Sequence, residues 1–217
     1  MAGSVFAGER KIGKPGDQLE PATVLTLKTG TEYVSRGAHK LLHGLEHFAV
    51  DAKDLVAIDV GASTGGFTDV LLKAGAAKIY AVDVGYGQLH WSLRQDPKVV
   101  VLERTNARYL TRAEIPKPVD LLVCDASFIS LTKVLPAAME LAGEQAQLLA
   151  LIKPQFEAGR AEIGKGGVVR DAAVHRQVCE TIVSWLTECG WQVAGVTESP
   201  IKGPKGNIEF LVYARKR

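Results

Sequence analysis

The chain has 217 residues, of which 47% are hydrophobic and 23% are charged, and its formal net charge is +2. This composition is typical of a folded globular protein. It excludes a largely disordered chain and a polycation that binds nucleic acid through its overall charge. The three cysteines form no Cys-x-x-Cys pair, so we expect neither a disulfide framework nor a metal site, and a reducing compartment such as the cytoplasm is favoured.

The first 30 residues differ from the rest of the chain. Residues 5–7 and 24–27 have the composition of short strands, and the Lys-Pro-Gly-Asp sequence at 14–17 has that of a turn. We expect residues 1–30 to form a small separate unit. A linker near residues 28–31 would join it to a second domain that spans residues 31–217.

The second domain is predicted to begin with an amphipathic helix near residue 36, with Ser35 as its N-cap. Leu41, Leu42, Leu45 and Phe48 recur there at helical spacing. Strands and helices then alternate along the chain. The predicted strands are residues 55–60, 78–84, 99–102, 119–124, 147–152, 192–197 and 208–214, and the predicted helices are 66–73, 88–94, 130–142 and 172–189.

Nearly all of these strand segments are apolar along their whole length instead of alternating between apolar and polar residues. Such runs are typical of strands that are buried on both faces. They predict an α/β fold, in which helices cover both faces of a mostly parallel sheet.

A glycine-rich turn follows the first strand of this domain. Glycines allow a tight turn and a close approach of the backbone to a ligand, and the next helix presents its N-terminal amides. The turn lacks the Gly-x-Gly-x-x-Gly spacing of a dinucleotide site, and the acidic Asp59 suits the cationic amino group of S-adenosylmethionine better than a pyrophosphate. We therefore predict that S-adenosylmethionine is the cofactor. Its predicted contacts are Asp59, Gly61, Ala62, Ser63, Thr64, Gly65, Gly66 and Phe67.

Two further polar residues belong to the predicted cofactor site. Asp83 ends the second strand, about 20 residues beyond the turn, where an acidic side chain binds ribose hydroxyls. Asn106 follows the third strand. It would contact either the adenine or an adjacent backbone group, and a purely structural role in the turn is nearly as good an interpretation. NAD needs the same acidic residue, so an NAD-dependent dehydrogenase stays open as an alternative. The turn spacing and the lack of an obvious catalytic histidine weigh against it.

Six ordered segments carry specific motifs: YVSRGAHKL at 33–41, DVGASTGGFT at 59–68, DVGYGQL at 83–89, RTNARYL at 104–110, DASFIS at 125–130 and IKPQFE at 152–157. Together they resemble the TlyA (hemolysin A) family, a branch of the FtsJ-like ribosomal RNA methyltransferases, over roughly residues 31–217. The resemblance implies a Rossmann-like methyltransferase fold with a mostly parallel seven-stranded sheet and an antiparallel last strand. It also implies 2′-O-methylation of ribose, with cytidine as the expected nucleotide, and ribosomal RNA or ribosomal subunits as partners.

FtsJ-like enzymes use a Lys-Asp-Lys-Glu tetrad. The matching motifs place it on Lys40, Asp125, Lys153 and Glu209, and Asp125 would also lie beside the cofactor. A ribose hydroxyl is a poor nucleophile, so the reaction needs help with its proton and alignment with the methyl group. One lysine would act as the base after desolvation or beside a second cation, and either lysine fits this role.

Basic residues near the tetrad form the predicted RNA-binding rim. Residues 155–171 make a long connection for an α/β fold, which indicates a functional or disordered loop. The predicted phosphate contacts are Arg36, Arg160, Lys165, Arg170, Lys202 and Lys205. For each of these residues, an ordinary surface charge without contact to RNA is about as good an interpretation as a phosphate contact. Phe128 and Phe156 could stack on a base, although core packing is the default for each.

Residues 1–10 resemble the second half of an S4 RNA-binding domain, with residues 14–16 in its usual turn. The preceding S4 helices are missing, which implies a truncated start or their loss in this member. A non-catalytic RNA-binding protein and a membrane-damaging toxin are the remaining alternatives. The complete tetrad weighs against the first. The absence of an export signal and of an apolar run of about 20 residues weighs against the second, so we expect no membrane partner; no oligomeric state is predicted.

Overall fold

The structure is a computed structural model that describes residues 4–8, 10–12, 18–20, 22–28 and 32–216. In the described N-terminal part, β1 (Ser4–Ala7) pairs antiparallel with both β2 (Arg10–Ile12) and β3 (Leu25–Lys28). Strands β1 and β3 agree with the predictions for residues 5–7 and 24–27. The predicted turn at 14–17 and residues 29–31 of the predicted linker lie outside the described residues. The S4-like character of residues 1–30 therefore stays a prediction.

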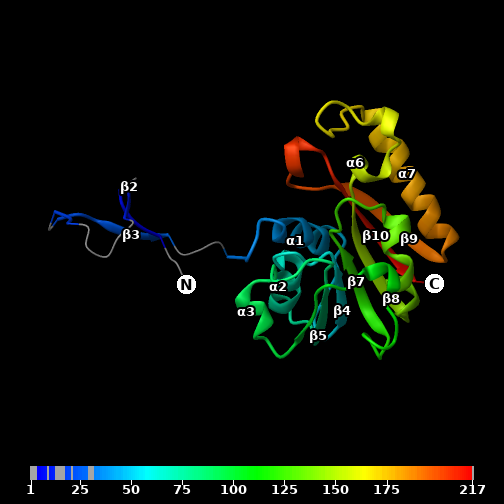
Figure 1. Cartoon of the computed structure of the whole chain (residues 1–217), viewed down its shortest axis with the longest axis horizontal. Coiled ribbons are helices and arrows are strands. Elements are labelled where there is room, and N and C mark those ends of the chain that lie inside the picture. The colour runs from blue at the N-terminus through cyan, green and yellow to red at the C-terminus, as the bar shows by residue number, and fades with distance from the viewer. Residues whose placement is uncertain (1–3, 9, 13–17, 21, 29–31, 217) are drawn as a thin grey trace.

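A second sheet forms the centre of the main body (Figure 1). Its strands are β4 (Val56–Val60), β5 (Lys78–Val82), β6 (Val99–Leu102), β7 (Val119–Cys124), β8 (Ala142–Ile152), β9 (Trp191–Glu198) and β10 (Phe210–Lys216). Among the described residues this sheet has seven strands in the order β6-β5-β4-β7-β8-β10-β9. Strands β4 to β8 pair in parallel, and β10 is antiparallel to both of its neighbours. This confirms the predicted α/β fold with its antiparallel last strand.

Helices cover both faces of the seven-stranded sheet (Figure 1). They are α1 (Ala38–His47), α2 (Gly66–Lys73), α3 (Trp91–Arg94), α4 (Leu131–Val134), α5 (Pro136–Glu140), α6 (Pro154–Glu157) and α7 (Ala172–Glu188), with 3-10 turns η1 (Ala107–Tyr109), η2 (Arg160–Glu162) and η3 (Pro204–Gly206). Helices α1 and α2 pack on one face, whereas α4, α5 and α7 pack on the other. No helix in the described part of the chain combines the length and the apolar character that a membrane span requires.

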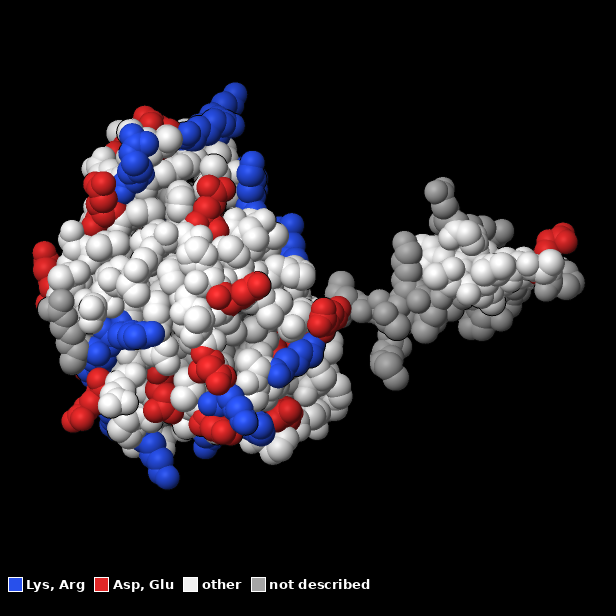
Figure 2. Space-filling view, turned by 180° about the vertical axis from the view of Figure 1, so that it is seen from behind, with Lys and Arg blue, Asp and Glu red and all other residues white. Residues whose placement is uncertain are grey.

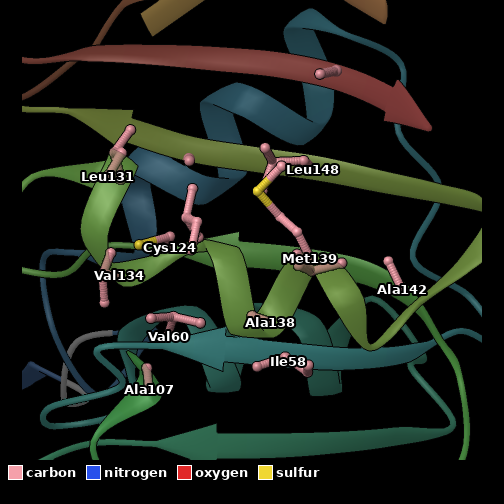
Figure 3. Close-up of a cluster of buried hydrophobic side chains, with 14 of the residues drawn as sticks. Ile58, Val60, Ala107, Cys124, Leu131, Val134, Ala138, Met139, Ala142 and Leu148 are labelled. Carbon is pink, nitrogen blue, oxygen red and sulfur yellow. The ribbon is translucent and has the colours of Figure 1, made fainter. Parts of the chain in front are cut away.

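The core between the sheet and α4 and α5 is shown in Figure 3, where Ile58 and Val60 of β4 and Leu148 of β8 lie among the labelled side chains. Successive side chains of a strand point to opposite faces, so Ala57 of β4 belongs to the core under α1 and α2. Cys124 at the end of β7 is fully buried, and burial raises the pKa of its thiol to about 12. Cys124 therefore packs as a small apolar residue.

The helix limits differ from prediction where a local feature interrupts the pattern. Helix α1 begins at Ala38 with Gly37 at its N-cap, so the prediction of Ser35 as the cap is wrong. Helix α3 begins only at Trp91, because the His90 ring accepts a hydrogen bond from the Ser92 amide and so caps the helix there. The predicted helix 130–142 is divided into α4 and α5. The second piece starts at Pro136, which has no N–H to continue the first.

Candidate active site

A cleft lies at the carboxyl ends of β4 and β7. The strand order reverses between these two strands, because the chain runs from β4 to β5 and β6 and then returns to β7 on the other side of β4. Open α/β sheets bind ligands at such a switch point. Two adjoining cavities of about 330 and 540 Å³ are lined by described residues here and share Gly61, Ser63, Asp125 and Ser127. We name the smaller one the tetrad cavity and the larger one the Asp83 cavity.

The glycine-rich turn forms one wall of the tetrad cavity. Gly61 has a backbone φ of 82°, and a Cβ at this position would lie 2.8 Å from the Cα of Ala126, so only glycine fits. Seven of the eight cofactor contacts predicted for residues 59–67 line this cavity: Asp59, Gly61, Ala62, Ser63, Thr64, Gly66 and Phe67. Gly65 is not among the described lining residues. It occupies the N-cap of α2 with a φ of 96° and faces Leu89 and Leu93.

Asp59 is fully buried in β4, with 0% of its surface exposed, and lies at the wall of the tetrad cavity. Its Oδ2 accepts a hydrogen bond of 2.6 Å from Oγ1 of Thr68, whereas Oδ1 has no partner among the described residues. Burial raises the pKa of Asp59 to about 7, with a smaller increase from Asp125 and an opposing effect of the Thr68 bond. An unpartnered carboxylate oxygen fits the cationic amino group of S-adenosylmethionine, which would favour the charged form of Asp59.

Asp83 and Asn106, the two further polar residues predicted for the cofactor, line the Asp83 cavity. Asp83 accepts hydrogen bonds from the amides of Ser63 (2.8 Å) and Gly85 (2.7 Å), so its carboxylate lies against the glycine-rich turn. Asn106 lines the same cavity, and its Oδ1 accepts a bond of 3.1 Å from the amide of Arg108, which caps η1. Asn106 is therefore a turn residue in this structure, and its contact with adenine stays a prediction.

The four tetrad residues come together from distant parts of the chain. Asp125 directly follows β7, Lys153 directly follows β8, and Glu209 directly precedes β10. Because β10 is antiparallel to β8, its first residues lie at the carboxyl end of β8. The alternation of side chains along strands directs all three toward the face that is covered by α1, which carries Lys40.

Their side chains form a connected cluster of two cations and two anions. The Lys40 Nζ lies 2.7 Å from Oε2 of Glu209 and 3.4 Å from both carboxylate oxygens of Asp125. The Lys153 Nζ lies 2.6 Å from Oδ1 of Asp125. Lys40, Lys153 and Glu209 are buried. Buried charges need such partners, because an isolated charge away from water is strongly unfavourable.

Two neighbours of the tetrad were not identified in the sequence. Besides its ion pair with Asp125, Lys153 donates hydrogen bonds to the backbone oxygen of Asp125 (3.0 Å) and to Oγ of Ser127 (2.9 Å). Gln155 donates from Nε2 to Oε1 of Glu209 at 3.1 Å. Each neighbour lies two positions beyond a tetrad residue in the chain. That spacing becomes informative only when the conformation of the turn is known.

The predicted RNA contacts fall into two groups. Arg36 and Lys202 line the tetrad cavity. The others are exposed and are not among its described lining residues: Arg160, Lys165, Arg170 and Lys205. Phe128 lines the Asp83 cavity and is 89% exposed, and its ring centroid lies 5.0 Å from that of Phe156.

Asn207 joins the two loops that carry most of these basic residues. Its Oδ1 accepts from the amide of Val169 at 3.1 Å, and its Nδ2 donates to the backbone oxygens of Gly167 (3.1 Å) and Pro204 (3.2 Å). Both loops lie at the end of the sheet that carries α6 (Figure 1). Lys and Arg side chains project from this upper end, and acidic and basic groups are mixed over the rest of the face in view (Figure 2).

Comparisons with known proteins agree with this geometry. Residues 33–216 match the family of FtsJ-like methyltransferases. The chain is 50% identical over 216 residues to the 16S/23S rRNA (cytidine-2′-O)-methyltransferase TlyA of Mycobacterium tuberculosis, which covers 99% of this chain and 81% of the relative. It is 39% identical to Hemolysin A of Brachyspira hyodysenteriae, with 98% and 89% covered. A solved structure of a candidate hemolysin from Streptococcus thermophilus superposes with a TM-score of 0.84 at 44% identity, over 99% of this chain and 79% of the other.

Proposed function

Because the chain belongs to the FtsJ-like methyltransferase family, we propose that it methylates the ribose 2′-hydroxyl of cytidine in ribosomal RNA. It is an S-adenosylmethionine-dependent methyltransferase, so the dehydrogenase alternative is wrong. The observation that carries the proposal is the ion-pair cluster of Lys40, Asp125, Lys153 and Glu209 at the tetrad cavity. The Mycobacterium tuberculosis relative, whose name states this reaction, supports the choice of nucleotide and of RNA.

The two cavities divide the proposed cofactor contacts between them. When bound, S-adenosylmethionine supplies an electrophilic methyl group on its sulfonium sulfur. We assign its amino group to Asp59 and its ribose to Asp83, with the adenine beside Asn106 in the Asp83 cavity. Asp125 and Ser127 line both cavities, so they lie where the methyl-bearing end and the target ribose would meet.

The tetrad would act on the target oxygen. The 2′-hydroxyl must lose its proton as its oxygen bonds to the methyl group, and the developing negative charge needs stabilisation. Lys40 and Lys153 supply two positive charges at the cavity wall, and Asp125 contacts both of them and so holds the amines in place. The proton of the 2′-hydroxyl can pass to the Asp125 carboxylate, or to one lysine amine if that amine is neutral when RNA binds, because a charged ammonium group has no lone pair to accept it. Alignment of the reacting atoms by these fixed groups contributes to the rate as well.

We propose that RNA is held at the mouth of the tetrad cavity and along the loops above it. Arg36 and Lys202 would contact phosphates next to the target nucleotide, since both line the cavity. The exposed Arg160, Lys165, Arg170 and Lys205 would bind phosphates farther along the strand. Phe128 would stack on a base. Residues 1–30, as an S4-like segment, would add affinity for RNA. A ribosomal substrate would be met in the cytoplasm, which is the location that we propose.

The proposed function is tested by methyl transfer from S-adenosylmethionine to ribosomal RNA, with the modified positions mapped as 2′-O-methyl marks. Lys153→Ala and Asp125→Ala are expected to lower methyl incorporation by at least about 100-fold, because each removes a charge at the reacting centre. Lys133→Ala is the matched control, since Lys133 is an exposed lysine of α4. Unchanged incorporation by the Lys153 and Asp125 variants would contradict the assigned site. Methylation of a base in place of ribose would contradict the assigned reaction.

A further inference from the structure

Glu209 is the most enclosed member of the tetrad, because its side chain is 0% exposed. Its Oε2 pairs with Lys40, and its Oε1 accepts the N–H of Gln155. Gly203 closes the remaining side, since a Cβ at that position would overlap Oε1 of Glu209. A carboxylate enclosed in this way depends on protein donors for both of its oxygens.

Gln155 lies on α6, two residues after Lys153, and is itself buried. A carboxylate only accepts hydrogen bonds, so the amide nitrogen of Gln155 must face Glu209. The amide oxygen is then left without a partner among the described residues. A buried, unpaired amide oxygen is unfavourable. The favourable contribution of the Gln155 amide at this position therefore comes from its N–H group, which donates to Glu209.

We infer that Gln155 is a positioning residue for the proposed methyl transfer, on which this inference rests: it holds Glu209 so that Glu209 keeps Lys40 against Asp125. The contacts form a closed ring that runs through Lys153, Asp125, Lys40, Glu209 and Gln155. The first and last members of the ring are two residues apart in the chain. Loss of the Gln155 N–H would free one oxygen of Glu209, so the carboxylate would turn toward another donor and move Lys40 with it.

The effect is expected on the chemical step and not on binding. Gln155 is not among the described residues that line the tetrad cavity or the Asp83 cavity, so we expect it to contact neither the cofactor nor the target ribose. Its influence must pass through Glu209 to Lys40. A substitution at position 155 should therefore lower kcat and leave the KM values for S-adenosylmethionine and RNA unchanged.

Two substitutions separate the N–H group from the volume of the side chain. Gln155→Met keeps the length and bulk of the side chain but cannot donate to Glu209. Gln155→Glu places a second carboxylate against the first one. We expect kcat to fall about tenfold in Gln155→Met and further in Gln155→Glu, with both KM values within about twofold of the wild type.

Gln147→Met is the matched control. Gln147 is a glutamine of β8 whose Oε1 accepts from the Tyr213 hydroxyl at 2.5 Å, and it is not among the described lining residues of either cavity. Its variant should keep the wild-type kcat, and thermal unfolding of every variant reports the loss of stability.

A full kcat in Gln155→Met, with an active wild type, would overturn the inference. Equal losses of kcat in Gln155→Met and Gln147→Met at matched loss of stability would overturn it as well. A wild-type chain that transfers no methyl group to RNA would instead refute the proposed function, and the inference with it.

Discussion

If Asp59 binds the amino group of the cofactor as proposed, we predict that cofactor binding depends on pH. Burial raises the pKa of Asp59 to about 7, so about half of the cofactor-free molecules carry a neutral Asp59 at pH 7. The cationic amino group of S-adenosylmethionine favours the charged carboxylate, so a neutral Asp59 must lose its proton when the cofactor binds. The affinity for S-adenosylmethionine should therefore decrease as the pH falls through 7 and below.

The size of the effect follows from proton linkage. A pKa of about 7 multiplies the dissociation constant by about 2 at pH 7, about 11 at pH 6 and about 100 at pH 5, if the carboxylate is fully charged in the complex. The dissociation constant should thus rise about fivefold from pH 7 to pH 6 and about tenfold over the next unit. An α-amino group has a pKa of about 7.7–8.0, so the cofactor stays cationic over this range.

Isothermal titration calorimetry between pH 5 and pH 7 measures this dependence. Buffers of different ionisation enthalpy should report the release of about half a proton per cofactor at pH 7. 5′-Methylthioadenosine keeps the adenosine but lacks the amino group, so its affinity should lack this dependence, and Asp59→Asn should remove the dependence for S-adenosylmethionine. A constant dissociation constant for S-adenosylmethionine, or an equal slope for methylthioadenosine, would refute the assignment of Asp59 to the amino group.

The same pKa predicts that Asp59→Asn stabilises the cofactor-free protein at pH 8. In the wild type the folded-state pKa is raised from 3.8 to about 7, so the free energy of unfolding falls by up to about 4 kcal/mol as the pH rises across this interval. The asparagine has no charge to bury and avoids this loss. A lower melting temperature of the variant than of the wild type would contradict the reasoning. Gly203→Ala should displace Glu209 by about 1 Å, because the added Cβ would overlap Oε1 of Glu209, and should lower kcat by up to about 100-fold. A wild-type rate in single-turnover kinetics would show that the position of Glu209 is unimportant. Phe128→Ala should leave the melting temperature unchanged, because Phe128 is 89% exposed. It should raise KM for RNA by about 5- to 150-fold, which corresponds to the loss of one stacked base. An unchanged KM would exclude the stacking role of Phe128.

The strands and the cofactor turn could be predicted because their signals are local. The apolar run at residues 55–60 becomes β4, which is buried on both faces, and the glycine-rich turn follows directly after it. The helix ends were less predictable, since capping contacts and proline decide them. Neither the His90 cap of α3 nor the division of the helix at Pro136 follows from apolar periodicity.

The early start of β8 was also not predicted. Its first residues, 142–146, lack the apolar run that marks the rest of the strand, and Ala142 pairs with Val119 of the neighbouring β7. Pairing with β7 therefore extends β8 toward its N-terminus, beyond the apolar run that predicts the strand. Sheet pairing joins residues that are distant in the chain, so a local pattern does not contain it.

The sequence by itself determined the alternation of strands and helices, the glycine-rich turn, and the motifs whose resemblance supplies Lys40, Asp125, Lys153 and Glu209. Only the tertiary structure decided that these four side chains lie on one face of the sheet and in contact. Lys40 and Glu209 are 169 positions apart, and their contact depends on the placement of β10 beside β8 and of α1 over that face.

The unpaired oxygen of Asp59 and the N–H of Gln155 on Glu209 were likewise decided by tertiary structure. Burial and hydrogen bonding arise where several elements meet, so no single segment of the sequence contains them.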